Sequence, residues 1–142
     1  MRIDIRKYLN GDPDDLIEVY FHEVSKSSWK SLFDWMKGRV TLLDCQYGRI
    51  PISDFSLNRF LSEELSYSAH IECSNGFELV LSIIENNELT IDIEFSSIDS
   101  EDDFSIFIAC INEIASVLNS KNYIICPEFQ KNNAFYINGE FL

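Results

Sequence analysis

Glycine and proline are scarce in this sequence, with five and three copies in 142 residues. So low a content excludes collagen-like and linker-like chains. Hydrophobic residues make up 46% of the chain, which excludes a disordered protein, because such chains lack the apolar mass to form a core. A chain of this length and composition predicts a single folded domain over residues 1–142.

Long apolar segments are also missing. No stretch approaches the roughly 20 consecutive apolar residues of a membrane-spanning helix. The N-terminal segment MRIDIRKYLNGDPDD contains neither an apolar core nor a small-residue cleavage site, so we expect no secretory signal peptide. Together these observations favour a cytoplasmic protein.

Basic residues are few, particularly in the second half of the chain. There are 11 Lys and Arg residues against 24 Asp and Glu, which gives a net charge of −13. Residues 67–142 contain two basic and thirteen acidic residues, a net charge of −11 for that half. A protein this acidic repels phosphate backbones, which argues against direct binding of DNA or RNA. A protein partner with a basic surface is the better match.

The sequence lacks motifs that are typical of enzymes or metal sites. The sequence has no GxSxG, Walker A or GxGxxG segment, and its two histidines, His22 and His70, lack HxxxH spacing. No catalytic residue, metal site or cofactor is therefore predicted, and we expect the protein not to be an enzyme. The four cysteines, which form no CxxC pair, are Cys45, Cys73, Cys110 and Cys126. We expect free, mostly buried thiols, while two disulfides remain the alternative that an even number allows.

The first half of the chain predicts strands and short helices. Residues 17–24 (IEVYFHEV) are rich in β-branched and aromatic side chains, which favours a strand. Ser27 or Ser28 is expected to cap a helix closed by Gly38, because apolar residues recur at helical spacing in this segment. The other expected elements are strands over 1–8 and 40–47, a turn over 10–13 and a short helix over 54–65.

Three successive strands are expected in the second half. Residues 67–73, 77–85 and 88–95 are the candidates. Asn75-Gly76 and Asn86-Asn87 separate them and are good hairpin turns, because Asn and Gly tolerate positive φ. In the third strand, apolar residues alternate with acidic or polar ones, so one face is apolar and the other is acidic.

A long helix and a final pair of strands complete the pattern. Asp99 or Ser100 is expected to cap a helix that begins at Glu101, where acidic residues interact favourably with the helix dipole. The final strands are expected over 123–126 and 134–137. The predicted fold class is α+β: an antiparallel β-sheet meander with one long C-terminal helix packed on its apolar face and a shorter N-terminal helix. The acidic face of the meander should then point to solvent.

Carboxylates are concentrated in residues 85–103, which contain no Lys or Arg. They are Glu85, Glu88, Asp92, Glu94, Asp99, Glu101, Asp102 and Asp103. Like charges so close repel, and a cationic partner would relieve that repulsion and associate faster. A solvated surface with a helix cap is the structural alternative. A Ca²⁺ loop is disfavoured because the segment lacks the required glycine, and a glycosidase pair is disfavoured because these carboxylates should be exposed.

Three further residues are candidates for contact with a partner. His70 and Glu72 are expected to lie side by side on the polar face of the first meander strand. Trp35 lies off the apolar stripe of the N-terminal helix, and exposed tryptophan is enriched at binding hot spots. Filling a gap against the sheet is the structural alternative for Trp35. The predicted partner-binding set is therefore Glu72, Glu88, Asp92, Glu94, Asp99, Glu101, Asp102, Asp103, His70 and Trp35.

The segment from Glu88 to Phe129 resembles the C-terminal half of small bacterial immunity proteins from polymorphic-toxin and contact-dependent growth-inhibition loci. In both, an acidic strand leads into a helix capped by Asp or Ser, here Asp99 to Asp103. A strand ending in Pro-Glu follows, here Pro127-Glu128, and the helix SWKSLFDWMKGR fits the same outline.

The resemblance implies a non-enzymatic cytoplasmic protein that binds and inactivates a cognate toxin, often a nuclease. Such families diverge rapidly, so no partner-contacting residue is transferred by position. A type III secretion chaperone is the alternative, since those are small acidic α+β dimers that wrap an effector segment. A stable homodimer would favour the chaperone, and a monomer would favour the immunity protein.

Overall fold

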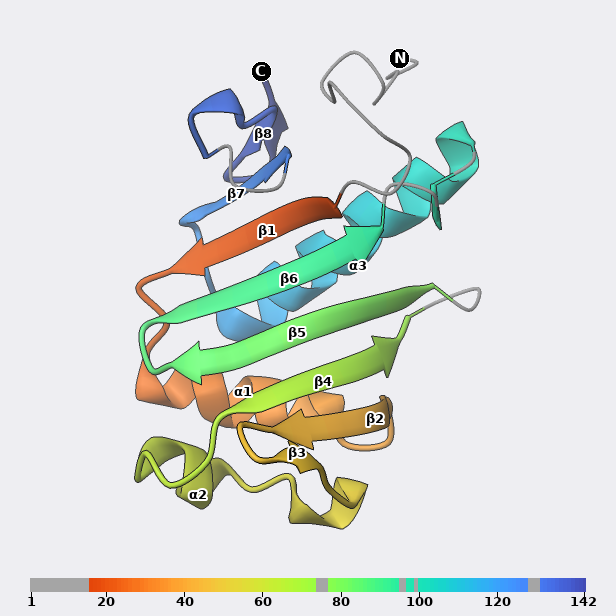
Figure 1. Ribbon diagram of the computed structural model, residues 1–142. Coiled ribbons are helices and arrows are strands. Elements are labelled where there is room, and N and C mark those ends of the chain that lie inside the picture. The colour runs from red at the N-terminus through yellow and green to blue at the C-terminus, as the bar shows by residue number, and fades with distance from the viewer. Residues whose placement is uncertain (1–15, 74–76, 95–96, 99, 128–130) are drawn as a thin grey trace.

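The computed structural model describes residues 16–73, 77–94, 97–98, 100–127 and 131–142. Within these segments, nine antiparallel strands form one sheet in the order β3-β2-β4-β5-β6-β1-β7-β8-β9 (Figure 1). The strands are β1 (Leu16–His22), β2 (Val40–Cys45), β3 (Gly48–Arg49), β4 (Tyr67–Glu72), β5 (Glu78–Glu85), β6 (Glu88–Glu94), β7 (Tyr123–Pro127), β8 (Tyr136–Ile137) and β9 (Glu140–Phe141). The helices are α1 (Lys26–Met36), α2 (Leu57–Leu61) and α3 (Glu101–Leu118), with 3-10 turns η2 (Ile52–Asp54) and η5 (Lys131–Asn133).

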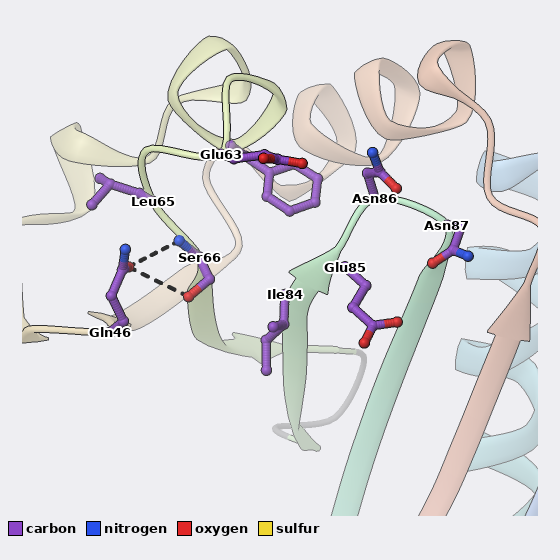
Figure 2. Close-up of a pocket in the computed structure, with 9 residues that line it drawn as sticks. Gln46, Glu63, Leu65, Ser66, Ile84, Glu85, Asn86 and Asn87 are labelled. Atoms are coloured by element: carbon purple, nitrogen blue, oxygen red, sulfur yellow. Dashed lines mark hydrogen bonds between the residues drawn. The ribbon is translucent and has the colours of Figure 1, made fainter.

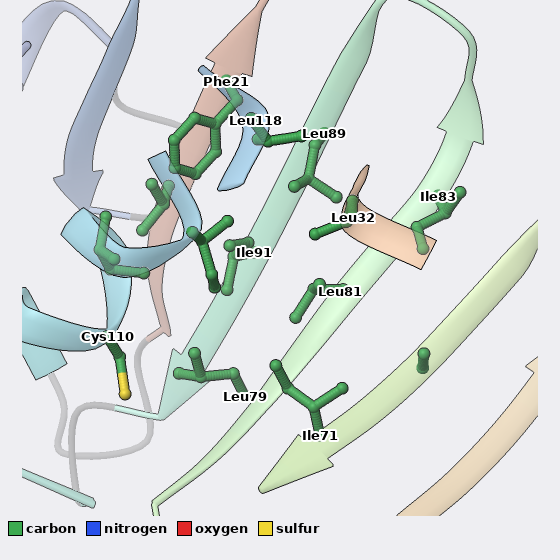
Figure 3. Close-up of a cluster of buried hydrophobic side chains, with 14 of the residues drawn as sticks. Phe21, Leu32, Ile71, Leu79, Leu81, Ile83, Leu89, Ile91, Cys110 and Leu118 are labelled. Carbon is green, nitrogen blue, oxygen red and sulfur yellow. The ribbon is translucent and has the colours of Figure 1, made fainter. Parts of the chain in front are cut away.

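The helices α1 and α3 lie on one face of the sheet, behind the strands in Figure 1. They pack against each other and against the alternate strand residues that point toward them. Figure 3 shows part of the resulting core, in which side chains from β1, β4, β5 and β6 meet both helices. Fully buried members of this cluster include Phe21, Leu32, Ile71, Leu79, Leu81, Ile83, Leu89 and Ile91. The predicted α+β class, with a long C-terminal helix on the apolar face of the sheet, is confirmed.

The strand β1 lies inside the sheet, between β6 and β7. The backbone of β1 is hydrogen-bonded to β6 on one side and to β7 on the other, and residues 17–21 are buried. This arrangement confirms the strand predicted over 17–24, which ends at His22. Because β1 joins β6 to β7, the sheet is much wider than the predicted three-strand meander.

Serine side chains cap both long helices. Ser100 accepts a hydrogen bond from the backbone N–H of Asp103 at 3.1 Å, which confirms one of the two predicted caps of α3. The cap of α1 is Ser25, so the prediction of Ser27 or Ser28 was wrong by two or three residues. Ser25 accepts from the N–H of Ser28 at 3.2 Å, because the helix begins already at Lys26.

Two other local predictions differ from the structure. The helix expected over 54–65 is only the short α2, since Glu63 adopts a left-handed φ of 65° that ends helical geometry. The strand predicted over 40–47 ends at Cys45 in β2, and the edge strands β3 and β9 were not expected. The strand predicted over 1–8, the turn over 10–13 and the Asn75-Gly76 turn fall outside the described residues.

Candidate functional site

The candidate site is the side of the sheet opposite α1 and α3, which we call the open face. It is turned to the viewer in Figure 1 and is built from alternate residues of β4, β5, β6 and β1, whose other residues enter the core. Its side chains are Ser68, His70, Glu72, Glu78, Val80, Ser82, Ile84, Glu88, Thr90, Asp92, Glu94, Glu18, Tyr20 and His22.

The open face is strongly acidic. Its carboxylates are Glu18, Glu72, Glu78, Glu88, Asp92 and Glu94. The predicted sharing of one strand face by Glu88, Asp92 and Glu94 is confirmed by the burial pattern of β6. The structure adds His70 and Glu72 to the same surface, two strands away. Glu72 and Glu94 are exposed, whereas Glu88 and Asp92 are half-buried.

Carboxylates stand directly opposite each other on neighbouring strands at three places. Glu72 faces Glu78, and Glu18 faces Asp92. At the β5–β6 hairpin, Glu85 faces Glu88. Like charges in directly opposed positions destabilise a sheet by roughly 0.2–1 kcal/mol for each pair. The sheet therefore holds a charge arrangement that does not serve its own stability.

Two histidines and one lysine lie close to these carboxylates. His70 Nδ1 lies 2.6 Å from Glu78 Oε1, and His22 Nδ1 lies 3.9 Å from Glu88 Oε2. Lys131 Nζ lies 3.6 Å from Glu88 Oε1 and 4.1 Å from the centre of the Tyr20 ring. Lys131 thus anchors η5 beside the open face, and it engages one carboxylate of six.

The Glu18–Asp92 pair is the most sheltered part of the open face. Glu18 is 6% exposed, and the Oδ1 atom of Asp92 is closed off from solvent. Burial raises the pKa of Tyr20 well above its ordinary value, and a hydrogen bond to Glu18 adds to the shift. Tyr20 is therefore a neutral donor beside an ionisable carboxyl group.

The helix itself explains the acidic residues at the start of α3, without a partner. Glu101 and Asp102 are exposed and Asp103 is half-buried, all in the first turn, where the helix dipole favours negative charge. Asp99 lies outside the described residues. The helix begins near the end of β6 at which Glu94 stands, since residues 95–100 connect the two elements.

Trp35 lies apart from the other predicted residues. It belongs to α1, on the helix-covered side of the sheet (Figure 1). Its Nε1 atom donates to Glu113 Oε1 of α3 at 3.2 Å, and the Arg39 guanidinium lies 4.5 Å from the ring centre. The structure therefore places Trp35 in a contact between two helices and away from the open face.

A pocket beside the open face was missed by the sequence analysis. It has a volume of about 410 Å³ and lies between the β5–β6 hairpin, the segment after α2 and the β2–β3 turn (Figure 2). Its lining includes Gln46, Glu63, Leu65, Ser66, Ile84 and Glu85. The alternation of β5 was a signal for one of them, because it puts Ile84 on the polar side of the strand. No local pattern could have joined Glu63 to Glu85.

The four cysteines are free thiols. Cys110 and Cys126 are buried and Cys45 and Cys73 are half-buried, so the expected burial is confirmed for the two in α3 and β7. Burial raises the pKa of Cys126 to about 11. A hydrogen bond with Cys110 raises the pKa of Cys73 far above its ordinary value, and burial adds to the shift, so this thiol stays protonated.

Two properties of the described residues bear on other classes of site. No cluster of three or more His, Cys, Asp or Glu side chains with metal-binding geometry occurs among them. Within the same residues, no helix has both the length and the apolar character needed to cross a bilayer.

No family model and no curated protein sequence matches the chain. Its fold does match a chain in the crystal structure of the toxic C-terminal tip of CdiA from Pseudomonas aeruginosa in complex with immune protein. The TM-score is 0.60 at 14% sequence identity, over 90% of this chain and 97% of the other. At this identity the match shows that the two chains share a fold.

Proposed function

We propose that this chain is a cytoplasmic immunity protein that binds a cognate toxin domain and neutralises it through the open face of its sheet. The fold shared with a chain of a toxin–immune complex supports this class of function. Within such a complex, a net charge of −13 and the lack of any reaction motif favour the role of the non-enzymatic inhibitor over that of the toxin.

The opposed carboxylates of the open face carry the proposal. Pairs such as Glu72–Glu78 and Glu85–Glu88, whose members are exposed or half-buried, set like charges opposite each other in the isolated protein. A docked cationic surface would turn that repulsion into attraction. A chain selected for its own stability alone would have Lys or Arg at some of these positions.

A nuclease is the toxin class that fits this surface. Nucleases need Lys and Arg to hold phosphate groups, and an acidic inhibitor can cover those residues or bind beside them. Complementary charge also accelerates association, up to about 10⁸–10⁹ M⁻¹s⁻¹ at low salt. Rapid capture is useful against a toxin that acts on the cell's own nucleic acid.

A pair of matched charge reversals tests the docking face. Glu72→Lys combined with Glu94→Lys alters two exposed residues of the open face. Asp34→Lys combined with Glu23→Lys makes the same change in net charge on α1 and in the loop before it. The affinity of each variant is measured at low salt for the toxin domain encoded beside the gene for this chain.

We expect the open-face variant to bind at least about tenfold more weakly than the wild type, and the helix-side variant to bind within about twofold of it. Equal losses in both variants would show that only total charge matters. Full affinity in the open-face variant would refute this docking face.

A further inference from the structure

The pocket at the β5–β6 hairpin adjoins the open face, and the proposed function leaves it unused. Its volume of about 410 Å³ lies within the roughly 300–1,000 Å³ of ligand sites. Ile84 and Glu85 also line a smaller hollow of about 190 Å³, which continues along the open face to Ser82 and Thr90. A protein docked on the open face would therefore reach the mouth of this pocket.

Ile84 forms an apolar contact point at that mouth. Its side chain is 65% exposed, whereas its neighbour Ile83 is fully buried. Polar residues Ser82 and Glu85 lie beside it on the same strand. A single exposed apolar side chain is common on protein surfaces, so the position of Ile84 at the pocket, where a docked protein would cover it, is what makes it a contact candidate.

Two carboxylates from different parts of the chain give the pocket negative walls. Glu63 follows α2, and Glu85 ends β5 (Figure 2). Neither carboxylate makes a hydrogen bond or an ion pair within the described residues, and the pocket lining contains no Lys or Arg. Glu85 also faces Glu88 across the hairpin. The pocket is therefore complementary to a cation.

The walls of the pocket are held in place before any partner arrives. Trp29 Nε1 donates to the carbonyl of Asn86 at 2.6 Å, and this fixes the hairpin turn to α1. Gln46 Oε1 accepts from the backbone N–H of Ser66 at 2.9 Å, which ties the β2–β3 turn to the segment after α2 (Figure 2). A preformed pocket loses little conformational entropy when it binds.

Two apolar side chains also line the pocket. Phe60 and Leu65 contribute to the lining and are both buried, and Phe60 packs edge-on against Trp29 with ring centres 4.8 Å apart. A lining that combines apolar and acidic side chains suits a side chain with an aliphatic stem and a cationic head. Arginine fits best, since its planar guanidinium can donate to two carboxylates at once.

We propose that this pocket receives an arginine side chain of the toxin, with Ile84 as the apolar contact beside it. This inference rests on the proposed immunity function. It adds a second contact to the open face, one made by shape and hydrogen bonding as well as by charge. Arginine is one of the residue types enriched at binding hot spots.

Paired amide substitutions test the inference. Glu63→Gln combined with Glu85→Gln removes both wall charges, one from a residue with positive φ and one from a strand end. Glu23→Gln combined with Glu140→Gln is a matched control, because Glu23 also has positive φ and Glu140 also lies in a strand. Ile84→Ser and Ile52→Ser, at exposed isoleucines inside and outside the site, form a second pair. The probe is the toxin domain encoded beside the gene, with each of its exposed arginines replaced in turn by alanine.

We expect the pocket double variant and Ile84→Ser each to weaken binding at least about tenfold, mainly through faster dissociation, with both controls within about twofold of wild type. One arginine replacement in the toxin should cause no further loss in the pocket double variant. If the pocket variants bind like their controls while the open-face reversal still weakens binding, the pocket inference is wrong and the proposed function stands. If the wild type does not bind the toxin, both the pocket inference and the proposed function are wrong.

Discussion

At the scale of single residues, Asn112 connects α3 to the C-terminal strands through one oxygen atom. The hydroxyl groups of Tyr123 and Tyr136 each donate to Asn112 Oδ1 at 2.9 Å. Burial raises the pKa of Tyr123 to about 12, and the neighbouring Tyr136 adds to the shift. The folded protein therefore holds Tyr123 in its neutral form.

Alkaline pH should destabilise the protein through Tyr123. The folded pKa lies above the unfolded value of 10.0, so the stability from this group is complete below pH 10 and is lost as the pH rises toward 12. Between these pH values we expect the unfolding free energy of the wild type to fall by about 2 kcal/mol more than that of Tyr123→Phe, as measured by urea unfolding. Tyr47→Phe, at a tyrosine that is 83% exposed, should keep the wild-type dependence. Parallel curves for the wild type and Tyr123→Phe would contradict the prediction.

At the scale of elements, α1 presents two tryptophans to different surroundings. Trp29 is fully buried, and its Nε1 donates to the β5–β6 turn at Asn86. Trp35 is half-buried, and its Nε1 donates to the exposed side chain of Glu113. The same residue type thus fixes a hairpin at one position and joins two helix surfaces at the other.

Replacement of each tryptophan by phenylalanine should separate these roles. Trp29→Phe keeps a ring in the core but leaves the carbonyl of Asn86 without its donor, so we expect a loss of about 1–3 kcal/mol in unfolding free energy. Amides of the β5–β6 hairpin should also exchange faster with solvent. Trp35→Phe should cost less than about 0.5 kcal/mol and leave hairpin exchange unchanged. Equal effects of the two substitutions would show that the Trp29 hydrogen bond does not hold the hairpin.

At the scale of the whole molecule, folding turns an uneven charge along the chain into a charged side of the protein. Residues 67–142 hold most of the net charge of −13, and the strands β4, β5 and β6 come from that half. Six carboxylates on the open face include Glu18, which comes from the first half through β1. Two copies that met through this face would repel each other.

The protein should therefore be a monomer. We expect light scattering after size exclusion to give the mass of one 16.5 kDa chain at low salt, where repulsion between open faces is least screened. Raised salt should leave that mass unchanged, because among the described residues of the open face only Ile84 is a large, strongly exposed apolar side chain, and its area is too small for a stable dimer. A stable homodimer at both salt concentrations would favour the secretion-chaperone alternative over the immunity protein.

Features that depend on neighbours in the sequence were predictable. The alternation in β6 correctly placed Glu88, Asp92 and Glu94 on one side, because successive strand residues point to opposite faces. The stripe of α3 and its serine cap followed from the same kind of local rule. Contact of these acidic residues with a partner stays a prediction.

Local pattern was therefore enough to establish an α+β protein with an acidic strand face, since backbone geometry alone sets the periods of strands and helices. Long-range pairing decided the rest. It placed β1 beside β6, so that Glu18 faces Asp92, and it turned Trp35 toward α3. The pocket required three segments distant in sequence to meet, and such contacts arise from the packing of one shared core, which no single segment encodes.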